Sequence, residues 1–235
     1  MTKGSADSVP SLGATSPRRV LLTGFEPFDA ESLNPSWEAV RALDGWQCEG
    51  ATVHSRRISC VFGASLRELD AAIDELRPEL VLCIGQAGGR SEITPERIAI
   101  NIDDGRICDN AGCQPIDQPV IAGAPAAYFS TLPIKAMVRD LRLAGVPAAV
   151  SNSAGTFVCN HLFFGLMHRL ASKAHGGEQR IRGGFVHVPY LPEQAVRFPS
   201  APSMAMESIV RGLRIMIATA LSVHEDVQLG GGQLH

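Results

Sequence analysis

Short apolar runs alternate with longer segments of helical periodicity along most of the chain. The apolar runs predict buried strands at residues 19–24, 51–58, 80–84, 148–151 and 184–188. Apolar residues three or four positions apart predict helices at 66–76, from about 133, from about 159 and at 204–223. Residues 97–102 alternate in polarity and predict one further strand, able to pair antiparallel. This strand-then-helix order predicts an α/β domain whose mostly parallel sheet carries helices on both faces.

Two connections add to this picture. Asn34 and Pro35 are typical of a helix start, because Asn caps free N–H groups and Pro at the first position sacrifices no hydrogen bond. Residues 103–123 are polar and rich in turn residues, and a connection of this length usually has a function. We therefore expect residues 103–123 to cover a functional site.

The length and composition of the chain indicate a single domain. The 235 residues are 45% hydrophobic and 19% charged, which suits one compact domain with a sizeable core. Residues 1–17 are rich in Ser, Gly, Ala and Pro and lack the apolar core of a secretory signal. We expect a disordered extension at 1–17, a single domain at 18–225 and a flexible tail at 226–235.

Charge and cysteine content exclude several classes of partner. The formal charge is −3 without a long basic run, so we expect no nucleic-acid partner. No segment approaches the roughly 20 apolar residues of a membrane helix, which predicts a soluble cytoplasmic protein without a membrane partner. The six cysteines are scattered without a CxxC pair, as in cytosolic proteins with reduced thiols. Cys108 and Cys113 lack a second pair of ligands nearby, so we expect no metal.

Cys159 is the candidate nucleophile. It follows a strand end and a run of small residues, and it begins a segment of helical periodicity. In the first turn of a helix, free N–H groups and the helix dipole stabilise a thiolate and lower the thiol pKa. The same N–H groups suit a developing oxyanion. The alternative is a packed, unreactive thiol, which is the commoner fate of an intracellular Cys.

A thiol nucleophile needs a base, and position favours His187 among the seven histidines. His187 lies near the end of an apolar strand, and open α/β sheets bind ligands at the carboxyl ends of their strands. A core histidine bonded to backbone is the alternative. His161 is not expected to be the base, because side chains two apart on a helix point to different faces. Glu96 is the candidate acid that orients the imidazole, and its alternative role is a surface ion pair with Arg97.

A glycine-rich turn at residues 85–90 follows one predicted strand. It lacks the dinucleotide fingerprint and the ending of a P-loop, so it does not specify phosphate binding. Close approach of the backbone to an uncharged substrate explains the glycines equally well. On these residues alone, a nucleoside- or phosphate-binding enzyme and a non-catalytic binding module remain alternatives to a peptidase.

Six segments together resemble the pyroglutamyl-peptidase I family, also called pyrrolidone-carboxylate peptidases. They are LTGFEPF at 22–28, NPSWEA at 34–39, GQAGGR at 85–90, ITPER at 93–97, AGTFVCNH at 154–161 and GGFVHVPY at 183–190. The likeness runs from about Val20 to the last predicted helix. It implies a three-layer α/β/α sandwich of phosphorylase/hydrolase-like type with a mixed, mostly parallel twisted sheet. It also implies no cofactor and a homotetramer or dimer.

The resemblance places the family's nucleophile, base and assisting acid on Cys159, His187 and Glu96. The activity it implies is removal of N-terminal pyroglutamate from peptides through an acyl-enzyme. It further implies that backbone groups of Asn34 and Gln86 bond the lactam and that Arg90 lies near the thiol. The apolar walls of the pocket would be Phe25, Phe28, Phe157 and Val158. A flat, neutral lactam suits apolar walls with a few hydrogen bonds.

The sequence departs from the family pattern at three positions near these segments. Ser59 and Cys60 stand where Pro-Thr is often found, and Cys108 stands where Pro is frequent. Cys60 is the departure that bears on substrate affinity and on sensitivity to oxidation.

Overall fold

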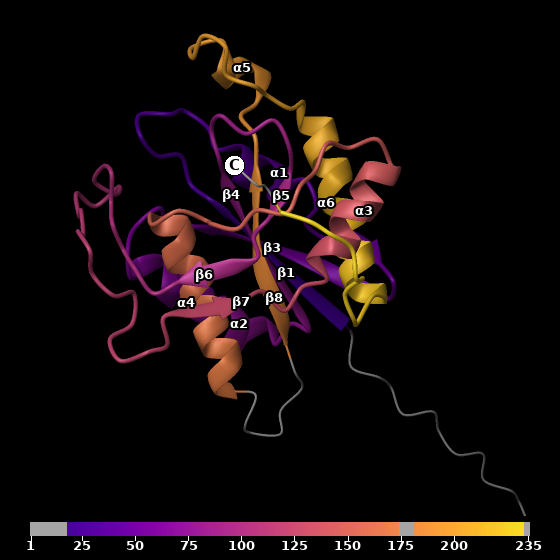
Figure 1. Ribbon diagram of the computed structural model, residues 1–235, viewed down its shortest axis with the longest axis horizontal. Coiled ribbons are helices and arrows are strands. Elements are labelled where there is room, and N and C mark those ends of the chain that lie inside the picture. Colours follow the sequence, from indigo (N-terminus) through magenta and orange to yellow (C-terminus); the bar gives the residue numbers. More distant parts are fainter. Residues whose placement is uncertain (1–17, 174–180, 233–235) are drawn as a thin grey trace, which may run out of the picture.

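The fold is a three-layer α/β/α sandwich around a six-stranded sheet (Figure 1). The computed structural model describes residues 18–173 and 181–232, so the predicted extension at 1–17 lies outside the described residues. In chain order the elements are β1 (Arg18–Phe25), α1 (Pro35–Arg41), β2 (Gln47–Cys48), β3 (Ala51–Ile58), α2 (Ala64–Leu76), β4 (Leu80–Gln86), β5 (Thr94–Pro95), β6 (Ile98–Ile100), β7 (Ala127–Phe129), α3 (Ile134–Leu143), α4 (Val158–Lys173), β8 (Arg182–Val188), α5 (Pro192–Ala195) and α6 (Met206–Ser222).

The central sheet is mostly parallel, as the sequence predicts. Its strand order is β2-β3-β1-β4-β8-β5. Strands β3, β1, β4 and β8 pair in parallel, while the two-residue strands β2 and β5 add antiparallel edges. Strands β6 and β7 form a separate antiparallel pair that packs on α4. The carboxyl ends of β1, β4 and β8 therefore meet at one edge, where a ligand site is expected.

Two hydrophobic cores lie on opposite faces of the sheet, because successive strand residues point to opposite sides. One core contains Leu82 and Val186 and packs under α1, α3 and α6. The other contains Cys83 and Phe185 and packs under α2 and α4. By the same alternation, Gly85 and His187 face the α4 side of the sheet.

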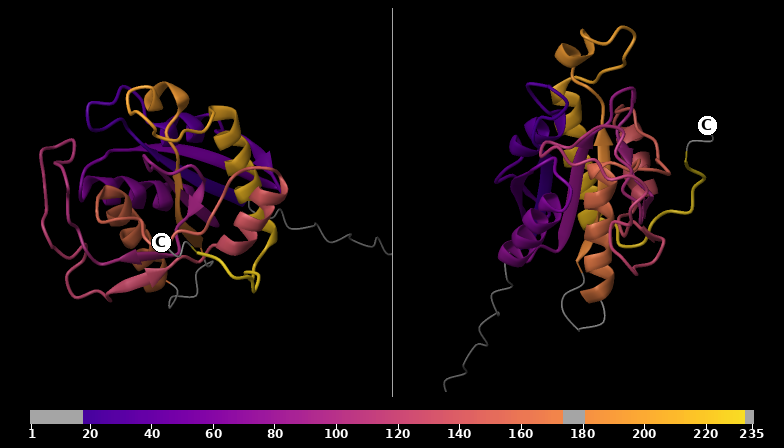
Figure 2. Two further views of the ribbon diagram at one scale, coloured as in Figure 1. Left: turned by 45° about the horizontal axis from the view of Figure 1, so that its top comes forward. Right: turned by 90° about the vertical axis from the view of Figure 1, so that its left-hand side faces the viewer.

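Helix boundaries follow the predicted signals closely. Asn34 caps α1, since its Oδ1 accepts a hydrogen bond from the Ser36 N–H at 3.0 Å, and Pro35 occupies the first helical position. Four further segments are not marked by periodicity: the short strands β2, β5 and β7, and the short α5, which stands clear of the layers (Figure 2).

The strand predicted at 148–151 is not a regular strand. Isolated parallel bridges join Ala148 to Ile93 and Ser151 to Glu96. The ladder between them is interrupted because Pro95 has no N–H to donate, although its carbonyl accepts a hydrogen bond from Ser151 N. This segment still fixes the backbone on both sides of Glu96.

Candidate active site

Cys159 lies in the first turn of α4, as its sequence context predicts. The helix begins at Val158, and Cys159 is half-buried. The loop before it is fastened to the connection at 103–123: Asp104 N donates to Thr156 O at 2.9 Å, and Thr156 Oγ1 donates to Asp104 O at 2.8 Å. The thiol is thus placed on a rigid element whose first N–H groups have no intrahelical partner.

His187 and Glu96 form a buried pair. His187 Nδ1 lies 2.7 Å from Glu96 Oε1, and their side chains are only 5% and 0% exposed. Strand pairing sets this contact, because Thr94 opposes His187 and Glu96 N donates to Phe185 O at 2.9 Å. A carboxylate at Nδ1 leaves Nε2 as the imidazole atom that can exchange a proton.

Cys159 and His187 converge on Gly85. Gly85 lies opposite His187 in the β4–β8 register, so both face α4. A Cβ at Gly85 would lie only 3.0 Å from Cys159 Sγ and 2.7 Å from Cζ of Phe185. The absence of a side chain at Gly85 therefore leaves room for the Cys159 thiol beside β8, the strand that carries His187. This glycine is needed for packing within the site.

The turn after Gly85 is explained in a similar way. A Cβ at Gly88 would lie 2.2 Å from Cζ of Tyr190, and Gly89 has a φ of +88° that favours glycine. These glycines accommodate protein side chains and a left-handed backbone. The turn has no feature that requires a phosphate.

The electrostatic environment of the thiol differs from the expectation of a lowered pKa. Burial raises the pKa of Cys159 to about 12, and the Glu96 carboxylate adds to the rise while Arg90 opposes it. The effect of burial thus exceeds that of the Arg90 guanidinium. A thiol whose pKa is raised in this way needs a base when it attacks.

Arg90 is the cation of the site. Its Nη1 donates to Glu96 Oε1 at 2.7 Å, and its Nη2 donates to Ser153 O at 3.1 Å. Burial acts to raise the pKa of Glu96, but the hydrogen bond with His187 and the charge of Arg90 outweigh it and hold that pKa below its ordinary value. Arg97, the alternative partner of Glu96, donates instead to Asn152 Oδ1.

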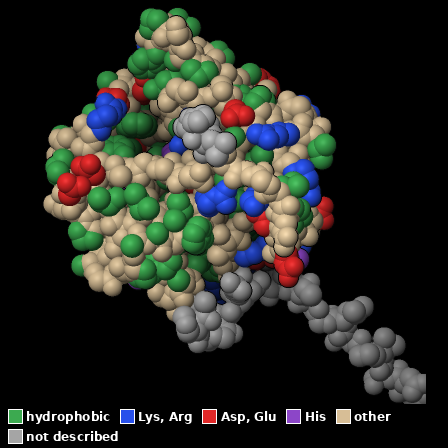
Figure 3. Space-filling view, viewed as in Figure 1, with side chains coloured by type: hydrophobic (Ala, Val, Ile, Leu, Met, Phe, Trp, Pro, Cys, Tyr) green, Lys and Arg blue, Asp and Glu red, His purple; other side chains and the backbone are tan. Residues whose placement is uncertain are grey.

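Four of the predicted wall residues lie around the first turn of α4 and the end of β1. Val158 and Phe25 are buried, and the Phe25 ring lies 6.3 Å from that of Phe185. The rings of Phe28 and Phe157 lie 6.2 Å apart. On the face seen in Figure 3, hydrophobic side chains line a hollow in the upper part, toward the carboxyl ends of the strands.

Asn34 and Gln86 have side chains that are already engaged by the protein. Asn34 Oδ1 accepts hydrogen bonds at the start of α1, and its Nδ2 donates to Glu26 O at 3.1 Å. Gln86 Oε1 accepts from Gln194 Nε2 at 3.0 Å. Both side-chain oxygens are thus engaged by the protein, which agrees with the backbone role that the family resemblance implies for these two residues.

Sequence reasoning missed several residues that shape the site. Phe62 packs edge-on against Phe157, with ring centroids 5.4 Å apart, and extends the aromatic wall. Buried Gln194 ties α5 to Gln86 at the end of β4. A Phe directly before Gly63 and a Gln within a four-residue helix give no periodic signal, so neither contact could be found from spacing.

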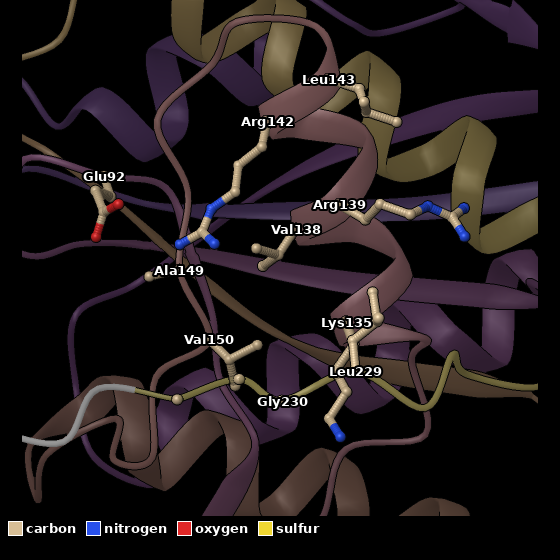
Figure 4. Close-up of a pocket in the computed structure, with 12 residues that line it drawn as sticks. Glu92, Lys135, Val138, Arg139, Arg142, Leu143, Ala149, Val150, Leu229 and Gly230 are labelled. Carbon is tan, nitrogen blue, oxygen red and sulfur yellow. The ribbon is translucent and has the colours of Figure 1, made fainter.

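A separate cavity of about 740 Å³ lies elsewhere on the molecule. Basic side chains from α3, including Lys135, Arg139 and Arg142, line it together with Glu92 and Val138 (Figure 4). Neither Cys159 nor His187 lines this cavity. It therefore holds none of the nucleophile and base chemistry described above.

Comparison with known proteins agrees with this geometry. A sequence model of the pyroglutamyl peptidase family matches residues 18–223. A pyrrolidone-carboxylate peptidase from Cupriavidus necator is 62% identical over 218 residues, which cover 93% of this chain and all of that protein.

Solved structures give the same result. The pyroglutamyl peptidase I of Bacillus amyloliquefaciens superposes with a TM-score of 0.86 at 47% identity, covering 92% of this chain and 100% of that one. A variant of the pyrrolidone carboxyl peptidase from Pyrococcus furiosus superposes with a TM-score of 0.82 at 40% identity, covering 86% and 98%. The sequence model, the identities and the superpositions agree over nearly the whole described domain, and the chain therefore belongs to the pyroglutamyl peptidase family.

Proposed function

We propose that this protein is a cysteine peptidase that removes an N-terminal pyroglutamyl residue from peptides, with Cys159 as nucleophile, His187 as base and Glu96 as the orienting acid. The observation that carries the proposal is the buried His187–Glu96 pair on the strand opposite Gly85, against which the Cys159 sulfur packs. Nucleophile, base and orienting group are the three parts that this chemistry needs.

Attack begins with proton transfer. The thiol proton passes to Nε2 of His187 as the sulfur bonds to the pyroglutamyl carbonyl carbon, so no standing thiolate is required. Glu96 holds Nδ1–H and stabilises the imidazolium that forms. Free N–H groups at the start of α4 stabilise the oxyanion.

Collapse of this tetrahedral species completes the first half. The C–N bond breaks, and His187 gives its proton to the leaving amine, which releases the shortened peptide. Water then attacks the thioester while His187 takes its proton, and pyroglutamate leaves as the thiol is restored. Both half-reactions use the same imidazole.

The apolar wall of the pocket suits a pyroglutamyl ring as the substrate group. The aromatic side chains Phe28, Phe62 and Phe157 form one contiguous group beside the nucleophile's helix. A pyroglutamyl ring is neutral and has no free amine, so it does not require the buried carboxylate that would bind an amino group. We propose that the ring occupies this apolar wall and that backbone groups of Asn34 and Gln86 bond its amide.

A chromogenic pyroglutamyl amide tests the assignment, with a prolyl amide of the same leaving group measured in parallel. The wild type is expected to cleave only the pyroglutamyl amide. Cys159→Ala is expected to abolish cleavage, whereas Cys113→Ala, which removes an exposed thiol, retains it. Undiminished turnover by Cys159→Ala would refute the nucleophile, and equal cleavage of both amides would refute the substrate.

We further propose a cytoplasmic location and a homo-oligomer, either dimer or tetramer. All six cysteines carry free thiols, which suits a reducing compartment. In the described part of the chain, no helix is long and apolar enough to cross a membrane. Val196, 83% exposed, and Phe198 lie just after the protruding α5 and suit contact with another subunit. Light scattering on the purified protein tests the oligomer, and a monomer mass contradicts it.

A further inference from the structure

A second buried histidine–carboxylate pair lies beside the site. His161 Nδ1 is 2.8 Å from Asp103 Oδ2, and the two side chains are only 6% and 8% exposed. On the other side of the ring, Gly63 N donates to His161 Nε2 at 2.9 Å. Both ring nitrogens of His161 are therefore engaged by the protein.

These two contacts fix the state of the ring. A backbone N–H can only donate, so Nε2 of His161 must be the acceptor and carries no proton. The imidazole is then neutral, with its proton on Nδ1 and donated to Asp103. Protonation at Nε2 would remove the acceptor that Gly63 uses, so this histidine is held out of proton transfer.

The pair joins three segments that are far apart in sequence. His161 belongs to the first turns of α4, Gly63 precedes α2, and Asp103 begins the connection at 103–123. Asp103 is itself anchored, because its backbone exchanges two hydrogen bonds with Gln118, at 2.6 and 3.0 Å. Asp109 Oδ2 accepts from Phe62 N at 2.9 Å and links the same connection to the loop before α2 a second time.

The clamped loop carries part of the pocket wall. Phe62 packs edge-on against His161 at 5.3 Å between ring centroids and against Phe157 at 5.4 Å. Phe157 in turn lies 6.2 Å from Phe28. Movement of the His161 ring would therefore displace the aromatic side chains that flank Cys159.

We propose that His161 is a positioning residue for the substrate pocket, acting as a neutral clamp that holds the Phe62 loop and the Asp103 connection against the helix of the nucleophile. The inference rests on the proposed peptidase function. It adds a specific role: His161 sets the affinity for the pyroglutamyl ring through the wall and takes no part in moving protons.

The first test is His161→Phe, which keeps a ring against Phe62 but removes both hydrogen bonds. We expect KM for a pyroglutamyl amide to rise about tenfold, the effect of losing a buried hydrogen-bond partner, with kcat within about threefold of wild type. The matched control is His168→Phe on the same helix, which removes a 2.9 Å contact with Tyr128 OH away from the pocket. An unchanged KM in His161→Phe, or an equal rise in His168→Phe, overturns the proposal.

Substitution of Asp103 gives a second test that leaves the imidazole in place. Asp103→Asn keeps an oxygen that accepts from Nδ1–H, so KM is expected to stay within about twofold of wild type, whereas Asp103→Ala is expected to raise it about tenfold. If Asn is as damaging as Ala, the pair requires a charged carboxylate and the neutral clamp is wrong.

The state of the ring can be read directly by NMR of the full chain with 15N-labelled histidine. We expect the His161 signals of a neutral ring protonated at Nδ1, unchanged by substrate analogue. A cationic ring, or a proton on Nε2, overturns the proposal. Failure of the wild type to cleave any pyroglutamyl amide would instead contradict the proposed function, and the NMR result would still decide the state of His161.

Discussion

Two buried histidine–carboxylate pairs in the described part of the chain have nearly the same geometry and different surroundings. Nδ1 lies 2.7 Å from the carboxylate in the His187–Glu96 pair and 2.8 Å in the His161–Asp103 pair. The backbone N–H of Gly63 occupies Nε2 of His161. Among the described residues, no hydrogen bond engages Nε2 of His187.

In the proposed mechanism, a histidine–carboxylate pair is not by itself a catalytic device. Both carboxylates fix a tautomer, but only a ring whose far nitrogen is not engaged by the protein backbone can pass a proton. Arg90 marks the same difference, because it forms an ion pair with Glu96, whereas no Lys or Arg in the described chain pairs with Asp103. The partner on the far side of each ring therefore decides its role.

The largest expected contrast comes from removing each ring. His187→Ala is expected to lower kcat by about 10²- to 10⁴-fold, because general acid–base catalysis is lost in both half-reactions. The clamp variant His161→Phe is expected to change KM instead. Steady-state kinetics on a pyroglutamyl amide measure both, and a His187→Ala enzyme with near-normal kcat would erase the distinction between the pairs.

A smaller loss is expected when the space between nucleophile and base is filled. Gly85→Ala places a Cβ 3.0 Å from Cys159 Sγ and 2.7 Å from the Phe185 ring. Misplacement of the thiol is expected to lower kcat/KM by about 100-fold. Gly230→Ala is the control, since nothing lies within 4 Å of its Cβ position. Equal activity of the two variants would show that Gly85 does not control the site.

Removing the Arg90 charge tests the electrostatic difference between the two pairs. Arg90→Met takes away a charge that lowers the pKa of both Glu96 and Cys159. We expect kcat/KM at neutral pH to fall about tenfold, as for loss of a charge-assisted hydrogen bond. The acid limb of the pH profile should move to higher pH. Arg97→Met is the matched control, and a profile equally shifted in it would contradict the role of Arg90.

The smallest effect is on stability. The folded pKa of Glu96 lies below its ordinary value of 4.5, so its ionised form stabilises the fold above that pH. This contribution is lost as pH falls below 4.5 and through the folded value. Urea unfolding of wild type and Glu96→Gln should therefore give a difference in unfolding free energy that shrinks on acidification. A difference independent of pH below 4.5 would contradict the lowered pKa.

Sequence reasoning reached the parts of this account that depend on local pattern. The alternation of strands and helices predicts the sheet and its two layers of helices, and a helix start predicts the location of Cys159. His187 could be chosen because it lies near the end of an apolar strand, and Glu96 because it lies between a glycine-rich turn and a predicted strand. Pairing of strands then brings them together, and the strand register follows from the buried faces.

The remaining features depend on contacts between distant segments. Gly63 and His161 are 98 positions apart, and neither position has a pattern that predicts their hydrogen bond. The helix start alone predicts a low thiol pKa, but burial, which only the packed structure reveals, acts in the opposite direction. The interrupted ladder at 148–151 likewise depends on Pro95 in a different segment.

The most direct test of the central claim is to trap the acyl-enzyme. An activated pyroglutamyl ester acylates quickly, so acid quenching during turnover followed by peptide mass spectrometry locates the covalent intermediate. The account predicts one pyroglutamyl group on the peptide that contains Cys159, accumulating in wild type and absent from Cys159→Ala. A pyroglutamyl group on another cysteine, or steady hydrolysis by Cys159→Ala, would contradict it.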